Sequence, residues 1–300
     1  MKNVITNEIW PWNEFYGLSH VLKEYAGYED DYRLKCVATH GIGRYSINDS
    51  LEYKQNLPVY LTCSTFEKYR IQQLRDSEVK VYSMAPWILY AKSLYDETQI
   101  NIKKKELGKN LLVLPSHSTN WLNLKSNVDG MAQEIIRIKD EYKFDSVTIC
   151  LYWLDILKGL DKTYKSYGFN ILCAGYMIDS CFLRRLRALI ELSDVAMGNG
   201  YTSAMWYAAS LGKPFYLWND NSMDCIEIIK TLKDSIPEVF SAFGEYNESF
   251  TNEQMGLIEK YCDIKSFKSP SELHSIFEES ERLYKEGNYK KYQGEYAYRY

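Results

Sequence analysis

A histidine followed by two nearby glycines is the first place in this 300-residue chain that could do acid–base chemistry. The run is Thr39-His40-Gly41-Ile42-Gly43-Arg44, and it follows a short apolar stretch that is typical of a strand. Because the glycines let the backbone turn tightly, His40 is expected at the carboxyl end of that strand. An imidazole titrates at about pH 6.5, so His40 is our candidate catalytic base. The alternative is a histidine held by local backbone groups.

A second histidine lies among three hydroxyl residues. The run is Leu114-Pro115-Ser116-His117-Ser118-Thr119-Asn120, and it also follows an apolar stretch. Hydroxyl groups and an imidazole N–H donate well to phosphate oxygens. We therefore predict that this segment binds a phosphate group through Ser116, His117, Ser118 and Thr119. A hydroxyl-rich turn that caps the next helix is the alternative.

A Gly-Asn-Gly turn connects a third apolar stretch to a helix. The run from 193 to 206 passes through Gly198-Asn199-Gly200 and opens the helix with Thr202 and Ser203. A helix N-terminus offers N–H groups and a partial positive charge, which suit a diphosphate. We predict a second set of donor-binding residues here, namely Gly198, Gly200, Thr202 and Ser203. Plain N-capping is the alternative.

The chain supplies alternating strands and helices that could bring these segments together. Apolar runs and turn residues predict strands at 33–39, 57–63, 79–83, 110–114, 146–152, 169–174, 194–197 and 215–218. Helical periodicity and capping residues predict helices at 64–75, 86–95, 128–142, 153–167, 183–192 and 202–211. Crossovers of this length allow parallel pairing, so an α/β fold with parallel sheets follows. In such sheets ligands bind beyond the carboxyl ends of the strands, where the three segments lie.

The length suits two lobes of about 100–200 residues each. Residues 101–110 are polar and charged, and we predict a linker there. The predicted division is an acceptor-side α/β lobe at 1–107 and a nucleotide-donor-binding α/β lobe with C-terminal helices at 108–300.

Composition limits the partners. The formal net charge is −4, whereas a nucleic-acid-binding protein usually carries an excess of basic residues. Bulk binding of nucleic acid is therefore not expected. The first residues lack the apolar core of a signal peptide, and no apolar run approaches the ~20 residues of a membrane span, so a cytoplasmic protein is expected. Seven cysteines without CxxC spacing and four scattered histidines predict free thiols and no metal site.

The order of these segments resembles a known superfamily. His40-Gly41, then Pro115-Ser116-His117, then Ser193-Asp194 and Thr202-Ser203, resembles the CDP-glycerol glycerophosphotransferases of teichoic-acid synthesis and is similar to capsule-type Kdo transferases. The run 193–218, with Gly212-Lys213-Pro214 before its last strand, is similar to the nucleotide-binding segment of bacterial GT-B enzymes. The sequence departs from those families where His117 is followed by Ser118, and where 198–203 replaces an Asp-Tyr-Ser-Ser pattern.

The resemblance implies a GT-B-like fold, with two Rossmann-like lobes and a cleft between them. It implies a metal-independent glycosyltransferase that moves a sugar from a nucleotide-sugar donor to a hydroxyl of a cell-surface polysaccharide or lipid-linked oligosaccharide. In those families the His-Gly of the first lobe is a base candidate, and the second histidine and the hydroxyl pair contact the donor phosphates. No cofactor is expected besides the nucleotide-activated donor. The resemblance also implies that the protein binds a glycan or lipid-linked acceptor, and that it contacts the inner face of the cytoplasmic membrane peripherally.

Three other functions stay open. A CDP-polyol phosphotransferase has the same fold. A UDP-sugar 2-epimerase also shares it, but it would need several carboxylates around the sugar, and the sequence shows no such cluster. A non-catalytic glycan- or nucleotide-binding partner of a polysaccharide assembly complex is the third.

Overall fold

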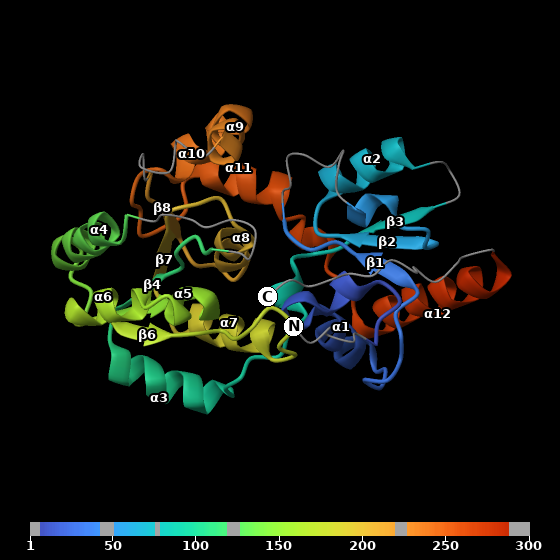
Figure 1. Ribbon diagram of the computed structural model, residues 1–300, viewed down its shortest axis with the longest axis horizontal. Coiled ribbons are helices and arrows are strands. Elements are labelled where there is room, and N and C mark those ends of the chain that lie inside the picture. The colour runs from blue at the N-terminus through green and yellow to red at the C-terminus, as the bar shows by residue number, and fades with distance from the viewer. Residues whose placement is uncertain (1–6, 43–50, 76–78, 119–126, 220–226, 288–300) are drawn as a thin grey trace. The chain divides into compact units, whose positions relative to one another are not determined.

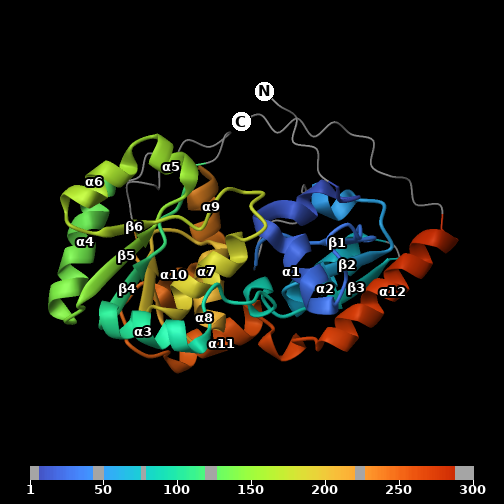
Figure 2. The same cartoon turned by 90° about the horizontal axis from the view of Figure 1, so that it is seen from below.

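The computed structural model describes residues 7–42, 51–75, 79–118, 127–219 and 227–287, which form two compact α/β units (Figures 1 and 2). Each unit holds one sheet whose strands all run parallel. The α/β class with parallel sheets that the sequence predicts is therefore confirmed. Unit 1 comprises Met1–Lys92, Met177–Leu183 and Ile258–Tyr300, and unit 2 comprises Ser93–Tyr176 and Arg184–Leu257.

Unit 1 is built on a three-stranded sheet with the order β1-β2-β3. Its strands are β1 (Cys36–Ala38), β2 (Val59–Thr62) and β3 (Lys80–Ser83). The helix α2 (Thr65–Leu74) connects β2 to β3, and it begins where the side chain of Ser64 accepts a hydrogen bond from the Glu67 N–H at 3.2 Å. This cap satisfies one of the N–H groups that a helix start leaves without a partner.

The end of the chain completes unit 1. The helix α12 (Pro270–Glu286) packs against α1 (Leu18–Ala26). The Tyr25 hydroxyl donates to the Lys268 carbonyl at 2.9 Å, and His274 Nδ1 lies 2.9 Å from the Ala26 carbonyl. Unit 1 also contains the short 3₁₀ helices η1 (Pro11–Gly17), η2 (Leu51–Lys54), η3 (Trp87–Leu89) and η5 (Ile264–Ser266). One core cluster of this unit contains Ile9, Trp10, Val37, Tyr53, Leu57, Tyr60, Ile71 and Val81.

Unit 2 is built on a five-stranded sheet with the order β6-β5-β4-β7-β8. The strands are β4 (Asn110–Val113), β5 (Ser146–Cys150), β6 (Asn170–Leu172), β7 (Val195–Gly198) and β8 (Phe215–Leu217). From β4 the chain moves to β5 and β6 on one side, and from β7 it moves to β8 on the other. Right-handed crossovers in opposite directions place their helices on opposite faces. Figure 2 shows α4 and α6 on one face of the sheet and α7 and α8 on the other.

The helices of unit 2 surround its sheet. They are α3 (Glu97–Leu107), α4 (Val128–Glu141), α5 (Trp153–Leu157), α6 (Leu160–Ser166), α7 (Phe182–Glu191), α8 (Ser203–Ser210), α9 (Glu227–Ser235), α10 (Pro237–Phe243) and α11 (Asn252–Tyr261), of which α7 and α11 extend into unit 1. Apolar residues spaced along α4 point into the core, as the periodicity of 128–142 predicts, with Met131, Ile135 and Ile138 buried.

The predicted linker at 101–110 is wrong. These residues belong mostly to α3, which opens with a capping box in which Asp96 and Gln99 bond each other's backbone N–H groups at 2.8 and 3.1 Å. No residue of α3 is buried, so it lacks the apolar periodicity that would reveal a helix. The units also divide the chain differently from the predicted lobes 1–107 and 108–300, because α3 belongs to unit 2 and α12 to unit 1.

Two predicted helices also differ from the structure. In place of a helix at 86–95 there is only η3, where Trp87 is buried and its Nε1 donates to the Thr39 carbonyl at 2.8 Å. The helix predicted at 153–167 is divided into α5 and α6 by Gly159, whose φ of 84° is left-handed. A left-handed residue interrupts the hydrogen bonding of an α-helix, and glycine adopts it without steric cost.

Candidate functional site

The candidate base of unit 1 is paired with a buried carboxylate. His40 lies two residues beyond β1, and its Nδ1 is 2.6 Å from Oε1 of Glu52. The backbone N–H of His40 donates to the same oxygen at 2.8 Å. The Glu52 side chain is fully buried, which fixes the position of the acceptor. A carboxylate that accepts from Nδ1–H leaves the lone pair of the neutral ring on Nε2, the tautomer that a general base requires.

Aromatic rings surround the imidazole. The rings of Trp12 and Phe15 both stand nearly perpendicular to that of His40, at 84°, with centroids 5.2 and 5.4 Å away. Trp12 is partly exposed and stacks on buried Phe15 at 5.5 Å. Aromatic pairs in these geometries stabilise each other beyond their burial. Unit 1 therefore holds His40 between a buried carboxylate and an aromatic wall, one ring of which reaches solvent.

The backbone beside this wall is strained. Tyr16 has a φ of 58° and a ψ of 21°, a left-handed conformation that costs a non-glycine residue on the order of 1–3 kcal/mol. Its N–H donates to the Met177 carbonyl. The next residue, Gly17, has a φ of 74°, and a Cβ there would lie 2.5 Å from the Ser180 carbonyl oxygen. The segment 177–183 therefore packs directly on the turn that carries the aromatic residues.

The predicted phosphate loops of unit 2 meet at the point where the strand connections diverge. β4 and β7 are neighbours in the sheet, with Val113 paired to Met197, but their chains continue to opposite sides. The carboxyl ends of two such strands open a crevice, and ligands of doubly wound sheets bind there. We call residues 114–118 and 198–203 the switch-point loops. Four predicted donor-binding residues lie in the second of these loops, and Ser116, His117 and Ser118 lie in the first.

Hydrogen bonds join the two switch-point loops. The Leu114 N–H donates to the Met197 carbonyl at 2.7 Å, and the Ser116 N–H donates to Oδ1 of Asn199 at 2.8 Å. Asn199 is 7% exposed, so its side chain forms a buried hydrogen bond between the loops. The sequence places Asn199 in the Gly-Asn-Gly turn but does not predict this role for it.

The glycines of the second loop permit close packing. A Cβ on Gly198 would lie 2.6 Å from the Leu114 carbonyl oxygen, and one on Gly200 would lie 2.0 Å from Oγ of Ser116. Neither glycine has the positive φ that would by itself require glycine. The two glycines are therefore explained by the approach of the first loop. A phosphate-binding role for either stays a prediction.

His117 packs against Tyr152 and is partly exposed. Its ring lies 4.3 Å from that of Tyr152, centroid to centroid, and its Nδ1 is 3.1 Å from the Ser118 carbonyl. Burial lowers the pKa of His117 below its ordinary value of 6.5, while the bond to the Ser118 carbonyl and the negative charge of Asp155 act to raise it. Because Nδ1–H donates to a carbonyl, Nε2 of the neutral ring is an acceptor. His117 can then donate to a phosphate from Nε2 only after it takes up a proton.

A buried carboxylate supports the first loop. Both oxygens of Asp155 lie 3.3–3.4 Å from the Ser118 N–H, and Asp155 is 3% exposed. Ser118 itself is 2% exposed, so its hydroxyl is not presented at the surface. Thr119 lies outside the described residues. Sequence reasoning missed Asp155 and Tyr152, although both follow β5 and the rule about residues after strands points to them.

The start of α8 offers donors to an anion. Thr202 occupies the N-cap position but its side chain makes no capping bond, and Thr202 and Ser203 are both partly exposed. The first N–H groups of a helix have no partner within the helix, and the helix dipole adds partial positive charge. This arrangement is the usual one for binding a phosphate at a helix start.

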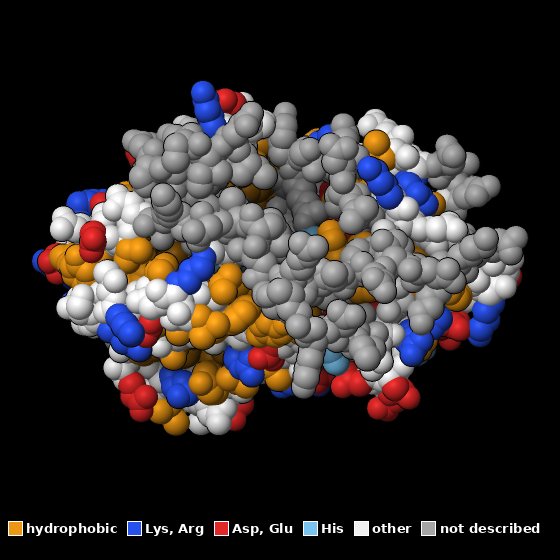
Figure 3. Space-filling view, in the orientation of Figure 1, with side chains coloured by type: hydrophobic (Ala, Val, Ile, Leu, Met, Phe, Trp, Pro, Cys, Tyr) orange, Lys and Arg blue, Asp and Glu red, His pale blue; other side chains and the backbone are white. Residues whose placement is uncertain are grey.

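Metal sites and membrane-spanning helices are absent from the described residues. Within 7–42, 51–75, 79–118, 127–219 and 227–287, no group of three or more His, Cys, Asp or Glu side chains could hold a metal ion. In the same ranges, no helix is long and apolar enough to cross a bilayer. The six described cysteines carry free thiols. Acidic and basic side chains are interspersed over the coloured part of the face in Figure 3.

No protein-family model matches the chain, and no curated protein matches it. Among solved structures, the wall teichoic acid polymerase TagF is similar to it, with 13% identity over 77% of this chain and a TM-score of 0.42. This chain spans 58% of that polymerase chain. A UDP-GlcNAc 2-epimerase from Neisseria meningitidis, bound to UDP-GlcNAc, is 12% identical over 90% of this chain and 81% of its own, with a TM-score of 0.44.

A glycosyltransferase from Rickettsia africae is also similar, with 12% identity over 84% of this chain and 71% of its own and a TM-score of 0.39. These solved structures thus include a teichoic acid polymerase and a glycosyltransferase, which are the kinds of enzyme that the sequence resembles. At these identities and TM-scores the likeness identifies neither an activity nor a substrate for this chain.

Proposed function

We propose that this protein is a glycosyltransferase that binds a nucleotide sugar in the switch-point loops of unit 2 and uses His40 of unit 1 as its base. The observation that carries the catalytic part is the pairing of His40 with buried Glu52. A binding protein has no need of a histidine whose tautomer is fixed by a buried carboxylate, whereas a base catalyst does.

The donor half of the proposal rests on the switch-point loops. The start of α8, with Thr202 and Ser203 partly exposed, would hold the diphosphate. Protonated His117 would add a charged hydrogen bond to it. These groups supply positive potential where charge grows on the leaving nucleotide, which is the largest single contribution in many transferases.

The reaction balances with these groups alone. Nε2 of His40 takes the proton of an acceptor hydroxyl, and the acceptor oxygen forms a bond to the anomeric carbon of the donor sugar. The bond from that carbon to the phosphate oxygen breaks, and its electron pair leaves with the nucleoside diphosphate. The acceptor would be a hydroxyl of a cell-surface polysaccharide or a lipid-linked oligosaccharide, and the partly exposed ring of Trp12 suits the apolar face of a sugar.

Product analysis separates this reaction from its rivals. The purified chain is incubated with UDP-GlcNAc, UDP-glucose or CDP-glycerol, with and without oligosaccharide acceptors, and the products are resolved by chromatography. A glycosyltransferase releases a nucleoside diphosphate only with acceptor, a CDP-polyol phosphotransferase releases CMP, and a 2-epimerase converts the sugar without releasing nucleotide. Tight nucleotide binding with no turnover would favour a non-catalytic partner.

The epimerase is the second candidate. Its specific support is Asp155, a buried carboxylate close to His117 at the same edge of the sheet. Turnover of UDP-GlcNAc without acceptor, lost in Asp155→Asn, would favour it over transfer.

A further inference from the structure

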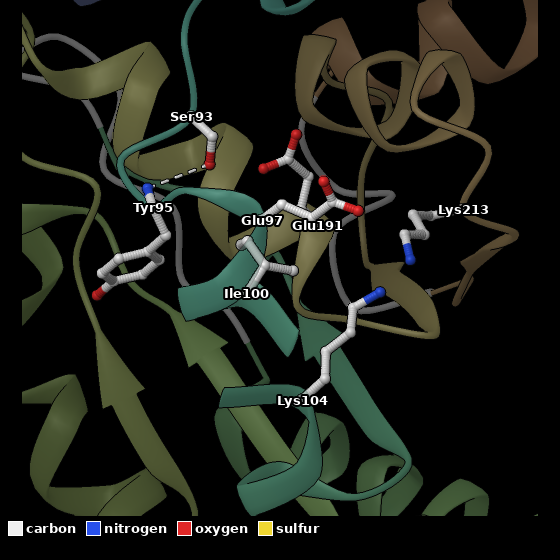
Figure 4. Close-up of a pocket in the computed structure, with 7 residues that line it drawn as sticks. All are labelled: Ser93, Tyr95, Glu97, Ile100, Lys104, Glu191 and Lys213. Carbon is white, nitrogen blue, oxygen red and sulfur yellow. Dashed lines mark hydrogen bonds between the residues drawn. The ribbon is translucent and has the colours of Figure 1, made fainter. Parts of the chain in front are cut away.

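A pocket of about 350 Å³ lies in unit 2 between α3, the end of α7 and the residues before β8 (Figure 4). Glu191 is the last residue of α7 and Lys213 lies two residues before β8, so these residues border the amino ends of β7 and β8. The switch-point loops follow the carboxyl ends of β4 and β7. The pocket is therefore separate from the proposed donor site and lies at the opposite edge of the same sheet.

One end of the pocket is basic. Figure 4 shows the side chains of Lys104 and Lys213 turned toward each other. The Lys213 ammonium is partly buried and donates to the Ser193 carbonyl. Burial lowers the pKa of Lys213, and the positive charge of Lys104 lowers it further, while the charges of Asp194 and Glu191 raise it. Two ammonium groups held close together in a half-buried place are stabilised by an anion between them.

The other end carries oxygen acceptors. Glu191 Oε1 accepts from Nε of Arg187 at 2.7 Å, which neutralises the carboxylate. Its second oxygen, Oε2, is buried and has no hydrogen-bond partner. The carboxylate of Glu191 keeps lone pairs for a further donor, so a ligand that brings an O–H group to this side of the pocket is favoured. Glu97, at the first turn of α3, adds an exposed carboxylate on this side.

The pocket also has an apolar wall. Figure 4 shows Ile100 beside the two glutamates, on the α3 side of the pocket. The lining therefore combines oxygen acceptors, an apolar contact and cations. A compound with hydroxyl groups, a carbon skeleton and a phosphate can meet all three, and pockets of roughly 300–1,000 Å³ hold molecules of that size.

We propose that this pocket binds a small phosphorylated polyol, with its phosphate on Lys104 and Lys213 and its hydroxyl groups on Glu191 and Glu97. Such a ligand donates O–H groups to the two carboxylates and places a dianion between the two ammonium groups. The proposal does not depend on the activity of the switch-point loops, because no residue is shared between the two sites.

Calorimetric titration of the full chain with glucose 6-phosphate tests the proposal. We expect Lys104→Met and Lys213→Met each to weaken binding by roughly 10–100-fold, the scale of losing a hydrogen bond to a charged group. Lys105→Met removes an exposed lysine from the same helix and should leave the affinity unchanged. Inorganic phosphate should bind more weakly than glucose 6-phosphate, and glucose should not bind measurably. Glu191→Gln should weaken binding of glucose 6-phosphate and not of inorganic phosphate.

Three results would overturn the proposal. One is an absence of binding to the wild type at millimolar concentration. Another is an equal affinity in all three lysine variants. The third is binding that survives Lys213→Met and is lost in Thr202→Ala with Ser203→Ala, which would assign the ligand to the switch-point loops. Circular dichroism checks folding, and Lys104→Met keeps the test valid if Lys213→Met unfolds.

Discussion

Glu52 receives two hydrogen bonds from His40 on one oxygen, from Nδ1 at 2.6 Å and from the backbone N–H at 2.8 Å. The two bonds hold both the ring and the main chain of His40 against a carboxylate that is closed to solvent. Such a carboxylate orients the imidazole and stabilises it once it has accepted a proton. The proposed role of His40 as a base therefore depends on Glu52, which lies twelve positions away in the sequence.

Replacing either His40 or Glu52 should lower kcat without weakening the binding of the nucleotide-sugar donor. We expect His40→Ala to lower kcat by about 10²–10⁴-fold, the usual contribution of a general base. Glu52→Gln keeps an oxygen that can accept from Nδ1–H but loses the charge, so a smaller loss of about 10–100-fold is expected. The measurement is kcat for nucleotide release, with donor affinity determined separately by calorimetry.

Glu24→Gln is the matched control, because Glu24 is an exposed carboxylate of unit 1 that forms an ion pair with Lys92. It should leave kcat unchanged. A His40→Ala enzyme that keeps most of its activity would show that the base lies elsewhere.

The close approach of the switch-point loops predicts the effect of a methyl group. In Gly200→Ala the new Cβ would lie 2.0 Å from Oγ of Ser116 and 3.3 Å from its Cβ, so the Ser116 side chain must turn away or the loops must move apart. Overpacking of this kind costs typically 1–3 kcal/mol of unfolding free energy. The double variant with Ser116→Ala removes the clashing oxygen and should recover most of that loss, as urea unfolding would measure.

Gly256→Ala serves as control for the glycine substitution. It lies in α11 with no atom within 4 Å of the added Cβ, so it should be neutral or stabilising. If Gly200→Ala is as stable as Gly256→Ala, the packing of the two loops differs from that described.

The lowered pKa of His117 predicts how stability depends on pH. The folded protein binds a proton at this ring at a lower pH than the unfolded chain does, whose histidine titrates near its ordinary value of 6.5. The free energy of unfolding should therefore fall as the pH drops from 6.5 through the folded-state pKa, and this group should contribute no slope above that window. His117→Asn should flatten that part of the profile. Equal slopes in wild type and His117→Asn would refute the assignment.

Donor binding should be coupled to a proton. Nε2 of neutral His117 is an acceptor, because Nδ1–H is engaged by the Ser118 carbonyl. A phosphate oxygen at Nε2 would favour the protonated ring and raise its pKa. We expect UDP binding at neutral pH to take up a proton, and to tighten as the pH falls toward the ordinary histidine range. Calorimetry in two buffers of different ionisation enthalpy measures the uptake, which should vanish in His117→Asn.

Much of the fold can be predicted because its elements carry local signals. The strands β4, β7 and β8 are buried apolar runs, α2 lies within the predicted helix 64–75, and α4 has a clear apolar stripe. The helix α3 shows the limit of this reasoning. It buries nothing, so its only signal is the capping box of Asp96 and Gln99.

The residues that support the site are harder to predict, because they act across the chain. Glu52 lies in a 3₁₀ helix with no periodic pattern, and only the fold brings it to His40. Asp155 and Asn199 are polar residues that the fold buries against the first switch-point loop. The place of α12 in unit 1 is set by contacts with α1 more than two hundred residues away, such as that of His274 with Ala26. The ends of predicted strands indicate where a site lies. The carboxylates that support the site can be identified only from the tertiary structure.

The most direct test of the account is the affinity of the switch-point loops for a nucleotide. The double variant Thr202→Ala, Ser203→Ala should remain folded by circular dichroism and should bind UDP or CDP roughly 1–3 kcal/mol more weakly than the wild type, the scale of lost hydrogen bonds to a charged group. Ser210→Ala, at the other end of α8, removes a hydroxyl that donates to the Tyr207 carbonyl at 3.0 Å, and it should leave affinity unchanged. The measurement is isothermal calorimetry with the three proteins side by side. An affinity equal to that of the wild type in the folded double variant would contradict the placement of the donor phosphates at the start of α8.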